Sequence, residues 1–178
     1  MASDDWWVSE QTFGGMGGPS LEATPSVADI GDHAGFGYMT YAMMWDLDIA
    51  AGETITSATL KVTTTTAGGN SSADWYLGTQ SGIDTTEPSS ASNAATAVNR
   101  SGSGWSSAGI TPSSDETQYS IDVKDEIVAI IARDDWASGG TITFFLSGPT
   151  TPDFESAAAE TLAASSSSDK PSLTVVYS

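Results

Sequence analysis

The 178-residue chain contains no cysteine and only one histidine, His33. Without cysteine it can form no disulfide, no thiolate nucleophile and no zinc–thiolate site. A single histidine also excludes metal sites built from several imidazoles, and it leaves a histidine-dependent catalytic triad without support. These absences remove the commonest nucleophile and transition-metal chemistries from consideration.

Basic residues are almost as scarce, since Lys and Arg total 5 against 23 Asp and Glu, for a formal net charge of -18. Nucleic-acid phosphates and anionic lipid headgroups are bound mainly through Lys and Arg side chains. We therefore expect no nucleic acid and no membrane surface as a partner. Copies of such an acidic chain repel one another, so any assembly has to bury enough apolar surface to offset the repulsion.

Long apolar runs are absent as well. The opening Met-Ala-Ser-Asp-Asp carries no basic residue ahead of an apolar segment, which a secretory signal requires. No stretch has the length needed to span a bilayer. The sequence therefore predicts a protein made and used in the cytoplasm, or one released by lysis.

Enzyme signatures are missing too. The sequence has no G-x-S-x-G, H-E-x-x-H or P-loop motif. A pair of neighbouring carboxylates, which a glycosidase needs, carries no information in a chain with 23 acidic residues. We therefore predict that the protein is not an enzyme and that it needs no cofactor.

What the sequence does contain is alternation of apolar and polar residues, the pattern of half-buried β-strands. It is clearest over residues 38–47, where Met39, Tyr41, Met43, Trp45 and Leu47 share one face. Similar stretches occur at residues 54–64, 73–79, 117–121, 141–147 and 173–177. One segment changes to a helical period, because Val123, Ile127, Ile130 and Ile131 fall on one helical face behind Asp122 in the N-cap position.

Together these elements predict an all-β fold, namely a jelly-roll β-sandwich with one short α-helix at about residues 122–133. We expect an irregular N-terminal arm and loop over residues 1–37 and the sandwich domain over residues 38–178. The Ser-, Ala- and Gly-rich region Ser81–Ser114 is expected to form long loops that hold one or two short strands, for example at residues 95–98. A jelly roll pairs early strands with late ones, so the same pairing is expected here.

Three segments carry a family resemblance. Tyr41–Leu60 is similar to the pattern L-x-F-D-L-x-x-I-P-x-G-A-T-I-x-S-A-x-L, with alanine in place of the proline. Ser120–Gly139 is similar to D-V-T … V-x-x-W-x-x-G, and Phe154–Ser156 with Lys170–Tyr177 is similar to F-x-S-x-E … R-P-x-L-x-V-x-Y. The chain thus resembles the DNRLRE-type, disaggregatase-related jelly-roll domains. The resemblance implies a carbohydrate-binding-module-like domain of the kind found on secreted polysaccharide-active and cell-surface proteins.

Aromatic residues in or beside loops are candidates for binding a glycan, because sugars stack on exposed indole and phenol rings. Trp75, Tyr76 and Trp105 are the candidates in this chain. The competing interpretation is that these rings fill the core or plug loops. Trp45 and Trp136 fall within the family-like segments and are expected in the core.

Oxygen ligands suit calcium, which binds several carboxylates and carbonyls. Asp4, Asp5, Asp29 and Asp32 are the candidate ligands for a structural calcium ion. The alternative is that these carboxylates are simply solvated. No EF-hand pattern supports the site.

The apolar residues of the N-terminal segment are candidates for binding a protein partner. Trp6, Trp7, Val8 and Phe13 could supply the apolar burial that the net charge makes necessary. This pattern favours a non-enzymatic structural protein of a phage virion, a capsid decoration or cement-like protein that assembles in the host cytoplasm. Its partners would be other virion proteins such as a major capsid protein, together with further copies of itself, for example in a trimer.

Two alternatives remain open at this point. One is a secreted or otherwise extracellular carbohydrate-binding module that recognises a polysaccharide. The other is a subunit of an extracellular filament or surface layer. Binding that depends on Trp75 or Trp105 would favour the module, whereas assembly that depends on the N-terminal segment would favour the virion protein.

Overall fold

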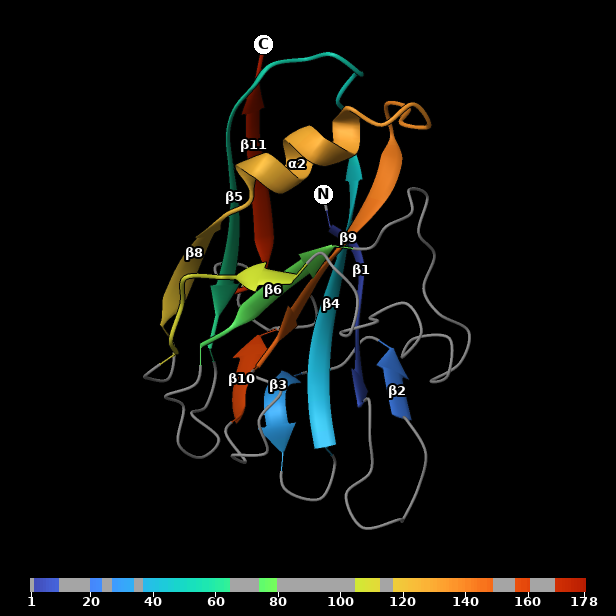
Figure 1. Ribbon diagram of the computed structural model, residues 1–178. Helices are drawn as coiled ribbons and strands as arrows, with labels where there is room; N and C mark the ends of the chain where they lie inside the picture. The colour runs from blue at the N-terminus through green and yellow to red at the C-terminus, as the bar shows by residue number, and fades with distance from the viewer. Residues whose placement is uncertain are drawn as a thin grey trace.

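The computed structural model describes residues 2–9, 20–23, 27–33, 37–64, 74–79, 105–112, 117–148, 156–160 and 169–178. Its strands form two antiparallel sheets, and one helix lies across the smaller sheet (Figure 1). The larger sheet consists of β1 (Ala2–Ser9), β2 (Ser20–Ala23), β3 (Val27–His33), β4 (Gly37–Leu47), β6 (Tyr76–Thr79), β7 (Trp105–Ser107), β9 (Gly140–Ser147) and β10 (Ser156–Glu160). The smaller sheet consists of β5 (Ile55–Thr63), β8 (Gln118–Asp122) and β11 (Ser172–Tyr177), and the helix is α2 (Lys124–Ile131). The predicted all-β sandwich with one short helix is confirmed.

Strands that are far apart in sequence pair with one another. In the larger sheet the order is β10-β3-β4-β9-β6-β7, and in the smaller sheet it is β11-β5-β8. Thus β3 pairs with β10, β4 with β9 and β5 with β11, all antiparallel. The expected pairing of early with late strands is therefore present.

The N-terminal region differs from its prediction. β1 runs antiparallel to β4, with Trp7 opposite Tyr41, and its other edge pairs with β2. β3 also pairs with β4, with Asp32 opposite Tyr38. The expectation of an irregular arm over residues 1–37 is therefore wrong for these three strands, which are hydrogen-bonded into the larger sheet.

The main core lies between the two sheets, on the face that the alternation of β4 predicts. Tyr41, Met43, Trp45 and Leu47 of β4 are all buried there, opposite the inward residues of β5. The ring centroids of Trp45 and Phe144 are 5.9 Å apart in an edge-to-face arrangement. Such rings supply the largest share of apolar burial in a core of this kind.

The opposite face of β4 and β9 is buried as well along most of its length, whereas Asp46, near the end of β4, is exposed. The buried side chains of this second face are 5% exposed or less: Thr40, Ala42, Met44, Thr143, Phe145 and Ser147. The Thr40 hydroxyl donates to Ser147 Oγ at 3.1 Å, which satisfies two buried polar groups together. Phe145 of this face contacts Trp105 of β7, which lies at the edge of the larger sheet.

Helix α2 packs against β5 with Ile127, Ile130 and Ile131 buried, as its apolar period predicts. It lies inside the predicted range of 122–133 and is shorter at both ends. The cap position is held by Val123, not by Asp122 as predicted. Asp122 lies one residue before this cap position. Its Oδ1 nevertheless accepts the backbone N–H of Lys124 at 3.0 Å.

The return from α2 to β9 is fixed by a buried tryptophan. Trp136 Nε1 donates to the carbonyl of Ile49 at 2.9 Å, and Gly139, with a φ of 87°, donates its N–H to Leu47 at 2.8 Å. Two exposed side-chain hydrogen bonds join the end of β4 to the start of β9 and the turn before it. The Ser138 hydroxyl donates to Asp48, and the Thr141 hydroxyl donates to Asp46. These two carboxylates therefore anchor a turn.

We expect Trp136→Phe to lower the free energy of unfolding by about 1–2 kcal/mol, because it leaves the buried Ile49 carbonyl without its donor. Urea denaturation measures the change. Ser138→Ala, which removes an exposed hydrogen bond of the same turn, is the matched control and should cost under about 1 kcal/mol. Equal losses in the two variants would contradict this assignment.

Candidate functional site

The antiparallel strand pair β6–β7 ends the larger sheet and carries two of the three predicted glycan-binding residues. β6 pairs with β9 on one side and with β7 on the other. In the register, Tyr76 lies opposite Ser107 and Gly78 lies opposite Trp105. Because residues two apart on a strand share a face, Tyr76 and Trp105 lie diagonally on one face of this strand pair. We call this surface the aromatic face (Tyr76, Trp105, Asp74, Ser107 and Thr111).

Trp105 lies flat on its neighbours. Its ring is stacked on Phe145, with centroids 6.2 Å apart and an interplanar angle of 29°. A Cβ added at Gly78 would stand 2.9 Å from two carbons of the indole, so the ring rests directly on that glycine. One side of the indole is thus supported by Gly78 and by the second buried layer, while the side chain as a whole remains only partly buried.

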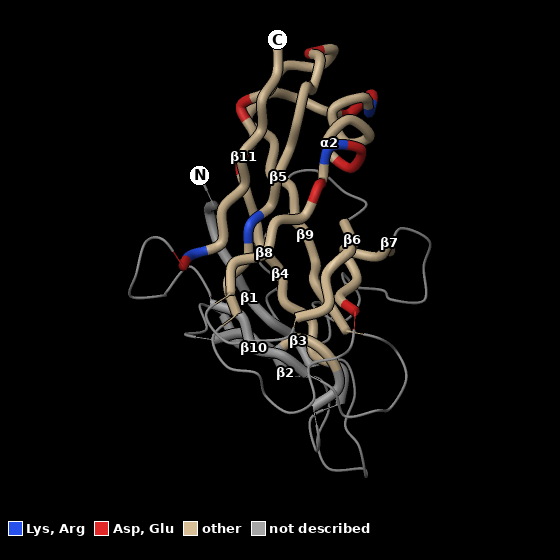
Figure 2. The backbone as a smooth tube through the Cα atoms, turned by 90° about the vertical axis from the view of Figure 1, so that its left-hand side faces the viewer, with Lys and Arg blue, Asp and Glu red and all other residues tan. Residues whose placement is uncertain are grey.

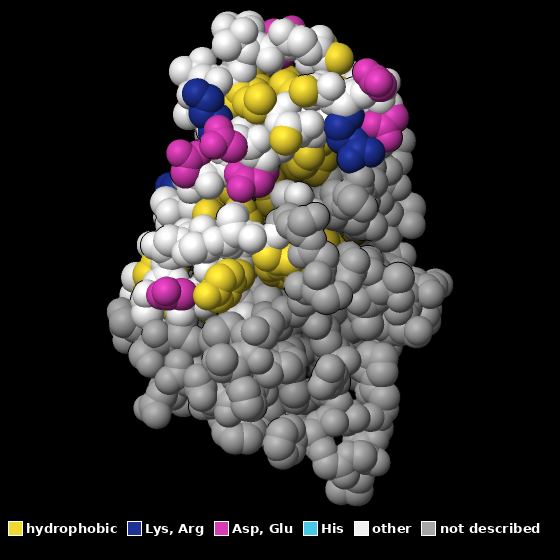
Figure 3. All heavy atoms as spheres, in the orientation of Figure 1, with side chains coloured by type: hydrophobic (Ala, Val, Ile, Leu, Met, Phe, Trp, Pro, Cys, Tyr) yellow, Lys and Arg dark blue, Asp and Glu magenta, His cyan; other side chains and the backbone are white. Residues whose placement is uncertain are grey.

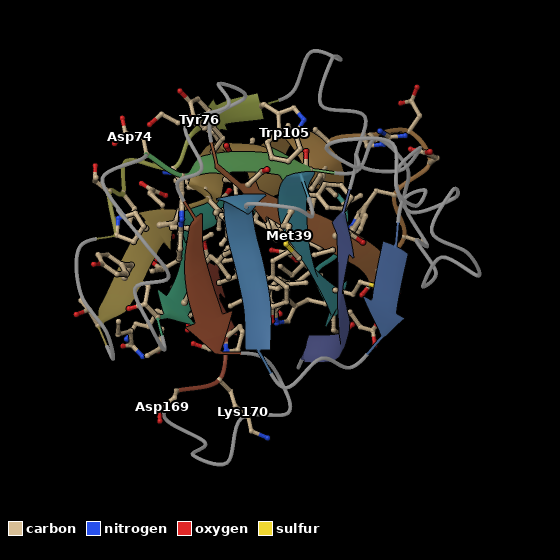
Figure 4. All side chains as sticks on the ribbon, turned by 90° about the horizontal axis from the view of Figure 1, so that it is seen from below. Met39, Asp74, Tyr76, Trp105, Asp169 and Lys170 are labelled. Atoms are coloured by element: carbon tan, nitrogen blue, oxygen red, sulfur yellow. The ribbon has the colours of Figure 1, made fainter. Side chains whose placement is uncertain are left out.

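Tyr76 is the exposed member of the pair, with 37% of its surface accessible. Polar groups surround it: the hydroxyl of Thr111 donates to Asp74, and Ser107 Oγ accepts the N–H of Gly109 at 3.1 Å. Figure 4 shows Asp74, Tyr76 and Trp105 along one edge of the molecule, beside β6. Figure 3 shows hydrophobic side chains reaching the surface on this side of the molecule.

The charge of the aromatic face restricts its ligands. Within residues 74–79 and 105–112, which form this edge, the only charged side chain is that of Asp74. No Lys or Arg stands in these two segments to pair with a phosphate, sulfate or carboxylate. Two aromatic rings beside hydroxyl and carboxylate groups suit a neutral ligand rich in hydroxyls.

An exposed salt bridge lies just after the end of α2. Arg133 Nε lies 2.9 Å from Asp135 Oδ1, and this hydrogen bond lowers the pKa of the Asp135 carboxyl and raises the pKa of Arg133. Both groups are exposed and neither belongs to the aromatic face. The pair therefore stabilises the turn after α2 only weakly.

The prediction that Trp75 binds a glycan is corrected by its burial. Its side chain is 1% exposed and meets Tyr119 edge to face, with ring centroids 6.1 Å apart. Its backbone N–H donates to Ile110 and its carbonyl accepts from Ala108. Trp75 points into the core because it shares its face with Leu77, whereas Tyr76 between them points outward.

The predicted protein-binding residues of the N-terminal segment occupy a different setting from the one expected. Trp6, Trp7 and Val8 lie on β1, whose backbone pairs with β4 and β2 of the same chain. Their side chains, and the whole of Phe13, lie outside the part of the chain that the structure describes. A free arm reaching across a neighbour is therefore not the arrangement of residues 2–9.

The four predicted calcium ligands do not converge along the backbone. Asp4 pairs with Met44 of β4, whereas Asp32 of β3 pairs with Tyr38. Six positions of one strand separate these partners, about 20 Å at roughly 3.4 Å per residue. Asp5 adjoins Asp4 on β1, and Asp29 lies on β3 with Asp32. The two pairs therefore cannot share one ion, and no cluster of three metal-binding side chains occurs among the described residues.

Sequence reasoning missed the residues that support the aromatic face. Gly78 and Phe145 hold Trp105, and Asp74 and Thr111 flank Tyr76. The glycine at an outward position of β6, two residues after Tyr76, is the signal that was present, since a strand glycine marks a place where another group approaches closely. Phe145 gave no such signal, because its role depends on β9 pairing with β6.

Comparison with known proteins adds no relative. No protein-family model matches the chain, and no curated protein matches its sequence. The resemblance to DNRLRE-type domains thus stays a prediction. Separately, the described part of the chain contains no helix with the length and apolar character that crossing a bilayer demands.

Proposed function

We propose that this chain is a non-enzymatic β-sandwich protein that binds a neutral polysaccharide on its aromatic face. The observation that carries the proposal is the placement of Tyr76 and Trp105 on one face of the paired strands β6 and β7, with Asp74, Ser107 and Thr111 around them. The resemblance to carbohydrate-binding-module-like jelly rolls agrees with this function.

The binding mechanism follows from how the rings are held. Trp105 rests on Gly78 and Phe145, so little conformational freedom is lost when a sugar ring stacks on it. Tyr76 adds a second stacking surface on the same face of the β6–β7 strand pair. The Asp74 carboxylate can accept hydrogen bonds from sugar hydroxyls. Ser107 can add a hydroxyl at the other side of Tyr76.

An array of β-linked hexasaccharides tests the proposal. The neutral cello, laminari, xylo and N-acetylchito series are compared with acidic polyuronate hexasaccharides. We expect at least one neutral series to bind and the polyuronates to fail, because the aromatic face has no cation and the chain carries a net charge of -18. Binding to polyuronates alone, or to no member of the array, would contradict the proposal.

A second candidate is a structural protein of a phage virion, of the capsid decoration type, which the exposed apolar side chains of β11 favour. Val176 and Tyr177 are 50% and 45% exposed, and β11 carries no charge in a strongly acidic chain. Such a strand offers an acidic protein a place to contact a capsid subunit or another copy of itself. Mass spectrometry of purified virions from a lysate that expresses the gene should find the chain in stoichiometric amounts. Recovery only in the particle-free fraction would refute this function.

A further inference from the structure

Strand β11 forms one edge of the smaller sheet. Ser172–Tyr177 pairs with β5, and no other strand pairs with it in the described part of the chain. Its sequence, SLTVVY, has no charged residue and is rich in β-branched side chains. Soluble proteins normally protect such an edge with a charge, a proline or a bulge, because its free backbone groups can pair with another chain. Here Pro171 stands before the strand and the register with β5 shifts only between Val176 and Tyr177, so residues 172–176 remain a regular edge.

The side chains of β11 are incompletely covered on both faces. Leu173 and Val175 point toward the core and pack against it, yet both remain partly exposed. On the outer face Thr174 is exposed, and Val176 is 50% exposed. A further strand laid along β11 would cover the inward pair without disturbing the existing core.

The opposite edge of the same sheet is different. β8 (Gln118–Asp122) carries Asp122 at its end, and Lys124 follows two residues later. Of the two edge strands of this sheet, β11 alone combines an uncharged sequence with half-buried apolar side chains. An interface with another acidic chain is therefore favoured at β11.

Charge is distributed unequally along β11. Lys170 lies two residues before the first residue of β11, next to Asp169, and Lys61 of β5 lies opposite Ser172. At the far end the Tyr177 hydroxyl donates to the carbonyl of Asp48, and Glu53 stands next to Thr54, which pairs with Ser178. Figure 2 shows basic positions beside the start of β11 and acidic positions toward the end marked C.

We propose that a second copy of this chain pairs with β11, antiparallel and about a two-fold axis at Thr174. In this register Leu173 lies opposite Val175 of the partner on the inner face, and Ser172 lies opposite the partner's Val176 on the outer face. The antiparallel arrangement also brings the lysine-bearing end of each strand beside the acidic end of the other. The smaller sheets of the two copies then join into one continuous sheet. The interface is self-complementary, because each copy contributes the same strand.

This interface is independent of the proposed polysaccharide site. Asp169 and Lys170, at the start of β11, lie on the opposite side of the view in Figure 4 from Tyr76 and Trp105. Loss of the pairing would leave the aromatic face intact, and loss of glycan binding would leave the pairing intact. Each can therefore fail without the other.

Cysteine cross-linking tests the pairing directly, because the chain has no cysteine of its own. Thr174→Cys should give a covalent dimer with a short bismaleimide, since the two introduced thiols face each other across the axis. Ser120→Cys, on the exposed outer face of β8, is the matched control and should stay monomeric. Equal cross-linking of the two variants, or none at Thr174→Cys, would overturn the proposal.

A charge substitution tests the same register without chemistry. Thr174→Lys places like charges opposite each other on the two-fold axis and should weaken dimerisation about fivefold. Ser120→Lys adds the same charge at the other edge and should leave dimerisation unchanged. Sedimentation equilibrium at about 0.1 M salt measures both, because the Debye length of about 10 Å exceeds the spacing of about 5 Å between paired Cβ atoms and leaves the local repulsion in place. A wild-type chain that stays monomeric, or equal weakening in both variants, would contradict the assigned strand.

Discussion

Trp75→Ala is expected to lower the free energy of unfolding by about 3–5 kcal/mol, the largest stability effect that we predict. The indole is 1% exposed and packs edge to face on Tyr119, so its removal leaves a cavity between the sheets. The backbone of Trp75 is fixed by Ile110 and Ala108, which limits how far the structure can collapse into that cavity. Urea denaturation followed by circular dichroism measures the change.

Tyr76→Ala is the matched control for this stability prediction. Tyr76 follows Trp75 directly and begins β6, but it is 37% exposed and points away from the core. Its replacement should cost about 1 kcal/mol or less, as surface substitutions usually do. If Tyr76→Ala destabilises the fold as much as Trp75→Ala, the assignment of inward and outward faces on β6 is wrong.

Trp105→Ala is expected to weaken binding of the selected neutral hexasaccharide about 10- to 100-fold. The indole supplies the larger of the two stacking surfaces, and Gly78 and Phe145 hold it in place before the sugar arrives. Isothermal titration calorimetry measures the affinity. The truncation also uncovers part of Phe145, so the free energy of unfolding is measured in parallel to separate lost binding from lost fold.

Two further variants define the binding prediction. Trp105→Phe keeps an aromatic ring over Gly78 and should retain part of the affinity. Val128→Ala removes a 40% exposed apolar side chain on α2, away from the β6–β7 strand pair, and should bind like the wild type. Equal affinity of Trp105→Ala and Val128→Ala would show that the sugar does not bind on the aromatic face.

Much of the sandwich could be predicted because its strands alternate over many residues. The inward residues of β4 extend over five alternate positions, and every one of them that was predicted to face inward is buried. The helical segment was equally clear, since three isoleucines on one face pack against β5. Its cap could not be predicted, because an Asp side chain can accept a backbone N–H from a turn just before the helix as well as from a cap.

The N-terminal strands escaped prediction for a physical reason. β1 carries Trp6-Trp7-Val8, three large residues in succession, so no period of two distinguishes a strand from an apolar arm. The glycine cluster that follows it favours a loop, and it separates β1 from β2. Only the pairing with β4 identifies the segment as a strand, and that pairing spans more than thirty residues of sequence.

The candidate site was predicted in part. Trp75, Tyr76 and Leu77 were recognised as one aromatic strand, but a strand of only four residues gave too few alternations to tell which ring points inward. The support of Trp105 by Phe145 depends on three strands, β7, β6 and β9, that lie far apart in sequence. Sequence patterning carries no information about such a contact.

Nuclear magnetic resonance of the 15N-labelled chain, titrated with the neutral hexasaccharide that the array selects, tests the central claim most directly. We predict that the indole N–H signal of Trp105 and the amide signals of Tyr76 and Ser107 shift in proportion to bound sugar. The indole signals of the buried Trp75 and Trp136 should stay in place. Shifts confined to residues outside the β6–β7 strand pair, with the Trp105 indole signal unchanged at saturation, would contradict the account.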